Sequence, residues 1–310
     1  MIKKTLYFGS PAYLSLKNEQ MEIRQPDVEK CKNLDDRFKA ETRKSISIED
    51  VGIVILDNTQ ITITQGLMTA LLENNIAVIT CDDSKMPIGL LLPLSSNTIQ
   101  EERYATQIEA SLPLKKQLWM QTIQYKIKNQ AAVLNKKTGD PCTNMMAWAN
   151  QVKSGDIENK EAQAAVYYWG HLFTEYPNFI RDRNGDMPNH LLNYGYAILR
   201  AIVARALTAS GLLPTLGIHH HNRYNAYCLA DDIMEPYRPY VDTIVIEILN
   251  QTEKSEFITK EQKIKLLEIP VTDVKIEGKR SPLAVAVAQT TASLYKCYSG
   301  ESRKISYPEI

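Results

Sequence analysis

The chain has 310 residues, of which 44% are hydrophobic, and it carries 36 basic and 36 acidic side chains. This composition is that of an ordinary globular protein with about two domains, and it excludes a disordered or fibrous chain. Because the formal net charge is zero, any surface that binds a polyanion must be local.

The cysteines and the apolar segments indicate the compartment. The five cysteines are scattered and never form a C-x-x-C pair, which favours a reducing compartment over a disulfide framework or a zinc knuckle. Gly9, Ser10 and Pro11 interrupt the first apolar segment, so no signal peptide is indicated. Apolar runs such as 53–56 are far shorter than the roughly 20 residues that a membrane helix needs. We therefore expect a cytoplasmic protein with no membrane partner.

The first 95 residues predict a small, strand-dominated domain with one helix. Short runs of β-branched and apolar residues alternate with polar turns, as in a sheet, whereas Ile63, Leu67 and Leu71 recur at helical spacing. Strands are expected within 5–23, 45–55, 76–80 and 85–94, and a helix is expected over 62–72.

A polar linker at 95–97 precedes long helical patterns, so the rest of the chain predicts a larger all-α domain. The expected fold class is therefore α+β, with one domain over 1–95 and another over 96–310. Helices are expected over 101–110, 114–134, 144–152, from Asn159 onward, 191–210, 230–249, within 251–269, and from Ser281-Pro282 onward.

Basic residues gather in two stretches of the second domain. Lysines spread along the predicted helix 114–134 are typical of a solvated helix face. The stretch 275–304 has six basic residues and two acidic residues, an imbalance that indicates phosphate contact. The candidates for contacting a nucleic-acid backbone are Lys115, Lys116, Lys126, Lys128, Lys279 and Arg280.

The segment 217–242 combines a run of histidines with a cluster of acids. If 230–240 is helical, Asp232 and Glu235 share one face, where a histidine could join them on a metal ion. Carboxylates favour Mg²⁺ or Mn²⁺, and an added imidazole leans toward Mn²⁺ or Zn²⁺. Such a site suits phosphodiester chemistry. The residues concerned are His219, His220, His221, Asp231, Asp232 and Glu235.

Plainer interpretations of the same residues stay open. The acids can complement a helix dipole, Arg238 can pair with them structurally, and Cys228 is expected to pack inward. A helix that starts with Asn159 as N-cap places Glu161 in its first turn, where residue chemistry alone favours a dipole partner. Asn193 lies in an apolar helix and needs partners, either at the site or at a neighbouring carbonyl.

Three strings resemble the CRISPR-associated integrase family Cas1, and most closely its type II members of subtype C. They occur in family order along nearly the whole chain. The resemblance implies a β-strand N-terminal domain that dimerises, a helical catalytic domain, and DNA chemistry at a metal site. The strings are IEDVGIVILDNTQITITQGLMTALLENNIAVITCD, NKEAQAAVYYW and NYGYAILRAIVARALTASGLLPTLGIHHHNRYNAYCLADDIMEPYRPYVD.

The resemblance also assigns site residues. Its E-x-x-A-A context maps to Glu161, and its G-x-x-H motif selects His220 and gives His219 no role. Its D-x-x-[DE]-P context matches Asp232 and Glu235, of which Glu235 is the expected direct ligand and Asp232 is a ligand or a partner of one. The implied metal is Mg²⁺ or Mn²⁺, and the implied catalytic residues are Glu161, His220 and Glu235.

The implied function is that of a metal-dependent DNA integrase and endonuclease of CRISPR adaptation. By the resemblance, it joins the 3′-OH ends of a double-stranded prespacer to the leader-proximal repeat by transesterification. Homodimers are expected to combine with Cas2 in a heterohexamer, and the effector nuclease of the same locus is a further candidate partner. Two alternatives remain: a non-catalytic DNA-binding scaffold of the same fold, and a structural protein that binds zinc through the histidine triplet.

Overall fold

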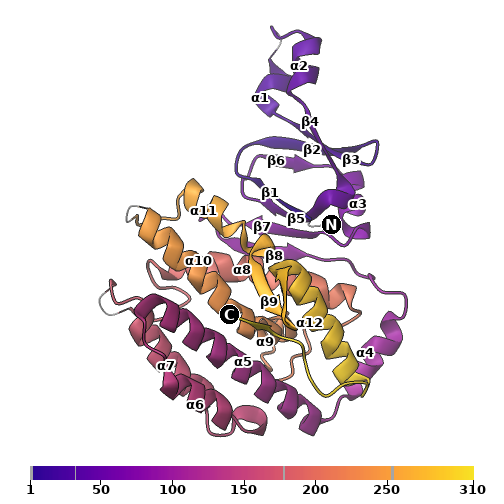
Figure 1. The fold of residues 1–310 in the computed structure, drawn as a ribbon. Helices are drawn as coiled ribbons and strands as arrows, with labels where there is room; N and C mark the ends of the chain where they lie inside the picture. The colour runs from indigo at the N-terminus through magenta and orange to yellow at the C-terminus, as the bar shows by residue number, and fades with distance from the viewer. Residues whose placement is uncertain (1–2, 32, 177–178, 253–254) are drawn as a thin grey trace. The chain divides into compact units, whose positions relative to one another are not determined.

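The computed structural model describes residues 3–31, 33–176, 179–252 and 255–310. The chain divides into two compact units, Met1–Ser96 and Asn97–Ile310, drawn in indigo to magenta and in magenta to yellow in Figure 1. Each unit has its own sheets, helices and buried residues, and we describe each by itself.

Two four-stranded sheets make up most of the first unit. One has the order β1-β5-β7-β8 and the other has the order β4-β3-β2-β6. Strand β5, with the sequence VGIVIL, has parallel neighbours on both sides, which explains its nearly continuous burial. The strands are β1 (Lys4–Phe8), β2 (Ala12–Lys17), β3 (Gln20–Arg24), β4 (Lys44–Ser47), β5 (Val51–Leu56), β6 (Ile61–Ile63), β7 (Ala77–Cys81) and β8 (Pro87–Leu91).

The expected helix of the first unit is α3 (Gln65–Glu73), which starts later than predicted. Residues 61–63 form β6, which pairs with β2, and the Thr64 hydroxyl then accepts a hydrogen bond from Leu67 N to begin the helix. Leu67 and Leu71 are fully buried against the sheet residues, as their spacing predicted. The helical turns η1 (Ile48–Asp50), α1 (Pro26–Lys30) and α2 (Asp36–Thr42) were not predicted, because three to seven residues are too few for a helical period to be visible.

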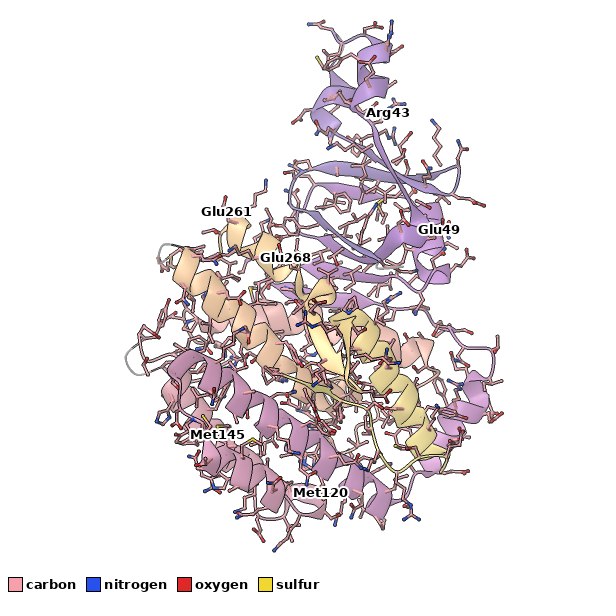
Figure 2. All side chains as sticks on the ribbon, in the orientation of Figure 1. Arg43, Glu49, Met120, Met145, Glu261 and Glu268 are labelled. Atoms are coloured by element: carbon pink, nitrogen blue, oxygen red, sulfur yellow. The ribbon has the colours of Figure 1, made fainter. Side chains whose placement is uncertain are left out.

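The second unit is built around α5, which packs against α6, α7, α10 and η3. Ser111 caps its start, and Gly139, with φ at 77°, ends it. Side chains fill the space beside α5, among them the fully buried Met145 of α6 (Figure 2). The helical elements are α4 (Gln100–Glu109), α5 (Leu112–Thr138), α6 (Thr143–Gln151), η2 (Ser154–Asp156), α7 (Lys160–Leu172), α8 (Asn189–Ala209), α9 (Cys228–Met234), η3 (Glu235–Tyr237), α10 (Arg238–Gln251), α11 (Lys260–Leu266), η4 (Ile269–Val271) and α12 (Leu283–Tyr298).

A small sheet corrects the expectation that the second unit is all-α. Its order is β10-β9-β11, formed by β9 (Asp273–Ile276), β10 (Lys279–Pro282) and β11 (Pro308–Glu309). Ser281 and Pro282 belong to β10, so the last helix begins at Leu283 and the expected cap at Ser281 is wrong. Strands of two to four residues carry too little alternation to be recognised in a sequence.

Among the described residues, no helix combines the length and the apolar character needed to cross a membrane.

Candidate active site

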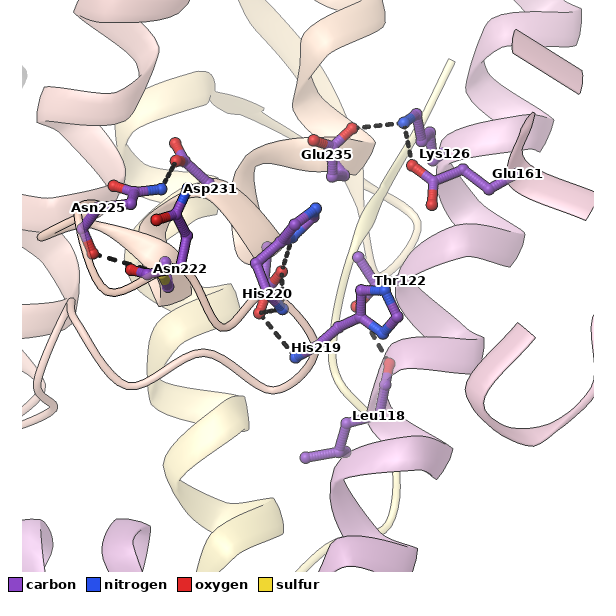
Figure 3. A network of polar contacts seen from close by, with 12 residues as sticks. Leu118, Thr122, Lys126, Glu161, His219, His220, Asn222, Asn225, Asp231 and Glu235 are labelled. Carbon is purple, nitrogen blue, oxygen red and sulfur yellow. Dashed lines mark hydrogen bonds and ion pairs between the residues drawn. The ribbon is translucent and has the colours of Figure 1, made fainter. Parts of the chain in front are cut away.

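Three segments of the second unit bring two carboxylates and one ammonium together. Lys126 Nζ of α5 lies 2.6 Å from Glu161 Oε1 of α7 and 2.6 Å from Glu235 Oε2 of η3 (Figure 3). The Lys126 side chain is only 11% exposed, so the expectation of a solvated lysine is wrong at this position. The structure therefore unites the two predicted acids through a lysine that had been grouped with surface residues.

Asp156, and not the predicted Asn159, caps the helix that carries Glu161. Asn159 stands at the N-cap of α7 with φ at 54°, and its side chain makes no capping bond. The carboxylate of Asp156 accepts hydrogen bonds from Lys160 N and Glu161 N, each at 2.9 Å. Asp156 thereby satisfies two backbone donors at the start of α7 and fixes the first turn that carries Glu161.

Glu235 lies where a proline interrupts the helix that was expected over 230–240. Pro236 has no backbone N–H, and the chain makes the turn η3 between α9 and α10. Glu235 Oε1 accepts a hydrogen bond from Arg238 Nε at 2.9 Å, which confirms the expected structural pairing. Burial by itself would raise the pKa of Glu235, but the charges of Arg238 and Lys126 outweigh it and lower the pKa to about 2. Glu235 is therefore ionised at neutral pH.

Asp232 holds the histidine loop against α9. Its carboxylate is fully buried and accepts hydrogen bonds from the backbone N–H groups of His219, at 2.9 Å, and His220, at 3.3 Å, and it also contacts His220 Nδ1. A Cβ at Gly217 would lie 2.4 Å from His220 O and 2.8 Å from Asp232 Oδ2, so this close approach requires glycine. The hydrogen bond to Asp232 raises the pKa of His220.

The histidines of the triplet have different surroundings. The His219 ring stacks on Trp119 with centroids 4.1 Å apart, and the His220 ring meets the same indole edge-on. Burial lowers the pKa of His219, and the neighbouring His220 adds to this effect. In Figure 3 the free nitrogen of the His220 ring is on the side of Glu235, whose charge acts on this imidazole. His220 is therefore the histidine that faces the acids.

The donor set of this site fits Mg²⁺ or Mn²⁺. Glu161 and Glu235 offer carboxylate oxygens on either side of a gap that now holds one ammonium, and His220 offers an imidazole nitrogen beside them. As the side chains stand, the described residues contain no group of three His, Cys, Asp or Glu close enough to hold a metal. The residues present therefore suit the metal chemically, while Lys126 stands between the two acids.

Asp231, Cys228 and Asn193 do not contribute side chains to this cluster. Asp231 turns away from the site and pairs with Arg200 Nε at 2.6 Å. Cys228 is buried, as expected. Asn193 Nδ2 donates to Arg183 O at 2.7 Å, and Asn193 Oδ1 accepts from the Arg181 guanidinium at 2.6 Å, so both partners lie in the preceding loop and not at the site.

The other basic candidates lie outside this cluster. Arg280 lines a groove of the second unit beside Lys275, but acidic residues, including Glu268 and Asp273, line the same groove, so it offers little net positive charge. Contact of these residues with DNA stays a prediction. Lys116, Lys279 and Arg280 are exposed, and Lys115 and Lys128 are half-buried.

Two residues that organise the site had not been recognised in the sequence. Lys126 shares a buried stripe of α5 with Trp119, Ile123 and Val133, at the spacing of one helix face. A lysine in such a stripe was the available signal for a buried charge. Asp156 left no signal, because it acts from a turn with positive φ ahead of the helix.

Comparisons with known proteins identify the family of this chain. The model of the family "CRISPR associated protein Cas1" matches residues 6–269, and the chain belongs to this family. The CRISPR-associated endonuclease Cas1 of Neisseria meningitidis serogroup C (strain 8013) is 36% identical over 268 residues, which are 86% of this chain and 87% of that protein.

Solved structures show that the fold is shared more widely. A casposase bound to integration product has a TM-score of 0.76 and 20% identity, covering 97% of this chain and 92% of its own. A Cas6-RT-Cas1–Cas2 complex has a TM-score of 0.74 and 19% identity, covering 98% of this chain and 36% of its own. At these identities the likeness concerns the fold.

Proposed function

We propose that the protein is a DNA integrase and endonuclease of CRISPR adaptation that acts in the cytoplasm. It joins the 3′-OH ends of a prespacer to the leader-proximal repeat by transesterification. The observation that carries this proposal is the meeting of Glu161, Glu235 and His220 from separate segments, in a chain of the Cas1 family. The subtype of the CRISPR system stays a prediction.

The proposed cofactor is Mg²⁺ or Mn²⁺, held by Glu161, His220 and Glu235. When bound, the metal would stabilise the charge that develops on the scissile phosphate and align the attacking oxygen. Asp232 supports this arrangement without needing to be a ligand. Because its carboxylate accepts from Nδ1 of His220, the lone pair of that ring is left on the nitrogen facing Glu235.

The proposed partners are double-stranded DNA, a second copy of this chain and Cas2. The Neisseria relative is named as an endonuclease, one neighbour is bound to an integration product, and another belongs to a Cas1–Cas2 complex. These names support DNA and Cas2 as partners. The homodimer, its heterohexamer with Cas2 and the binding of prespacer and repeat are part of the proposal. The effector nuclease of the same locus remains a candidate partner.

The test is strand transfer by the protein with its Cas2 partner, using a prespacer duplex, a supercoiled array plasmid and Mn²⁺ or Mg²⁺. Three variants are compared, Glu161→Ala, His220→Ala and His219→Ala. The first two lose a metal donor, and we expect half-site products to fall by about 10²-fold or more, whereas His219→Ala retains the donors and keeps most activity. Equal activity of His220→Ala and wild type would contradict the role of His220.

The same assay tests a non-catalytic scaffold, which is favoured by one observation. Lys126 already contacts both acids, and as the side chains stand the described residues contain no group of three metal donors. A scaffold would bind duplex ends as tightly as an integrase does but would give no metal-dependent product under any of these conditions. Tightly bound zinc in purified protein would instead favour the structural zinc protein.

A further inference from the structure

We propose that Lys126 is a built-in counter-ion, which occupies the cation position between Glu161 and Glu235 before metal binds and is displaced when metal binds. The inference rests on the proposed function, because it concerns the same acids. In this proposal Lys126 competes with the metal for the two acids. Either the ammonium or the metal ion lies between them at one time.

The Lys126 ammonium occupies the position that a metal ion would take between the two acids. The ammonium lies 2.6 Å from one oxygen of each acid, and Mg²⁺ or Mn²⁺ would bind such oxygens at about 2.1 Å. A divalent ion on both oxygens would therefore lie almost on top of the ammonium nitrogen. The two cations exclude each other, so the Lys126 side chain must leave the gap when both acids bind metal.

Before metal binds, the two acids need a positive charge close to them. Glu235 is 5% exposed and Lys126 is 9% exposed, and a buried carboxylate without a counter-charge is strongly unfavourable. Arg238 neutralises one side of Glu235 through Oε1 and does not reach across to Glu161 in any bond of the structure. Lys126 is the group that links the acids of α7 and η3, and it keeps the two donors in place before metal binds.

The Lys126 side chain is also able to move out of the gap between the two acids. Its ammonium sits at the end of a flexible four-carbon stem on α5, and the Glu161 side chain beside it is 25% exposed. A rotation of that stem toward the more exposed side of Glu161 would take the ammonium out of the gap. Lys126 then remains next to the site, where a phosphate of bound DNA would give it a new counter-charge.

The first experiment measures Mn²⁺ binding by calorimetry in wild type, Lys126→Met and Lys136→Met. Lys136 is an exposed lysine of the same helix, so the control removes the same charge outside the gap. We expect Lys126→Met to bind Mn²⁺ at least about tenfold more tightly than wild type, because a competing positive charge is gone. Lys136→Met should match wild type.

The second experiment needs no Lys126 variant and so is independent of whether Lys126→Met folds. An amine-acylating reagent is applied to wild type with and without Mn²⁺, and labelling of Lys126 and Lys136 is quantified by peptide mass spectrometry. We expect Mn²⁺ to increase Lys126 labelling several-fold and to leave Lys136 unchanged. Glu161→Gln, which replaces one charged metal donor with a neutral and weaker one, should show a smaller increase.

The outcomes separate this inference from the proposed function. Mn²⁺ binding with equal affinity in wild type and Lys126→Met, or unchanged Lys126 labelling on Mn²⁺ addition, overturns the displacement while leaving a metal-dependent integrase intact. Absence of Mn²⁺ binding in wild type and in Lys126→Met, together with absence of strand transfer, overturns both.

Discussion

The buried carboxylate of Asp242 shows how a single residue can set the pH dependence of this fold. Asp242 is 1% exposed and accepts hydrogen bonds from the hydroxyls of Tyr168, at 2.8 Å, and Tyr196, at 2.5 Å. The guanidinium groups of Arg238 and Arg181 lie 4.5 Å and 5.3 Å from the centre of the Tyr196 ring. Burial raises the pKa of Asp242 to about 6, although these hydroxyls and charges oppose the shift.

We predict that Asp242→Asn removes a loss of stability that wild type suffers as the pH rises. The pKa of Asp242 is higher in the folded protein than its ordinary value of 3.8, so ionisation favours the unfolded chain between about pH 4 and pH 6. The shift corresponds to about 3 kcal/mol, fully lost above the folded pKa. About 1 kcal/mol of this is already lost at pH 4.5, so urea unfolding should show that the variant gains about 2 kcal/mol on wild type between pH 4.5 and pH 7. A gain that is the same at both pH values would contradict the assignment to Asp242.

The resemblance to the Cas1 family identified site residues that residue chemistry alone had left open. Glu161, His220 and Glu235 were assigned by their sequence contexts, and the structure brings them to one place. Lys126 was predicted to contact DNA and was not assigned to this site, because its role here depends on contact with two acids that lie far away in the chain. Helical spacing shows that a lysine is on a buried face, but not what it faces.

At the scale of elements, the start of α7 depends on one carboxylate. We predict that Asp156→Ala lowers the free energy of unfolding by about 1–2 kcal/mol, because the N–H groups of Lys160 and Glu161 lose their acceptor. Strand transfer should also fall, since the first turn of α7 carries Glu161. Urea unfolding and the integration assay measure the two effects.

The matched control for this cap is Asp156→Asn, which keeps a side-chain oxygen as acceptor. It should lose less stability than Asp156→Ala and retain more strand transfer. If both variants unfold like wild type, Asp156 does not fix α7.

Helices could be predicted from the sequence where they were long, and short elements could not. The apolar spacing in 114–134 and 191–210 identified α5 and α8, because several turns repeat the same face. Strands β9, β10 and β11 have only two to four residues each: β9 and β10 form a short hairpin, and β11 pairs with β9 from about 30 residues further along the chain. The break at Pro236 was visible as a proline, yet the direction of the chain after it depends on packing against α5.

At the scale of the whole molecule, a net charge of zero does not reveal how charged residues are grouped locally. The chain has no net charge, but its site concentrates Lys126, Arg238, Glu161 and Glu235 in a poorly solvated place, where each charge meets an opposite one. Composition alone therefore indicated neither a DNA surface nor a catalytic centre. The net charge is a sum over the whole chain and does not show which charges are buried together, whereas the chemistry of the site depends on a few buried pairs.

Asn129 connects residues 308–310 to the candidate active site. This α5 residue is 2% exposed, and its amide donates to Pro236 O, at 2.8 Å, and to Pro308 O, at 3.0 Å, while its carbonyl accepts from Ile310 N, at 3.2 Å. One side chain thus ties β11 and η3, the turn that carries Glu235, to the central helix of the second unit.

We predict that Asn129→Ala costs about 2–4 kcal/mol of unfolding free energy, because it leaves buried carbonyls without donors. It should also reduce strand transfer more than this loss explains at a temperature where the variant is folded, since Pro236 directly follows Glu235. Asn135→Ala, an exposed position on the same helix, should change neither property. Thermal unfolding and the integration assay are run on all three proteins. Normal strand transfer by folded Asn129→Ala would mean that η3 holds Glu235 without the C-terminal segment.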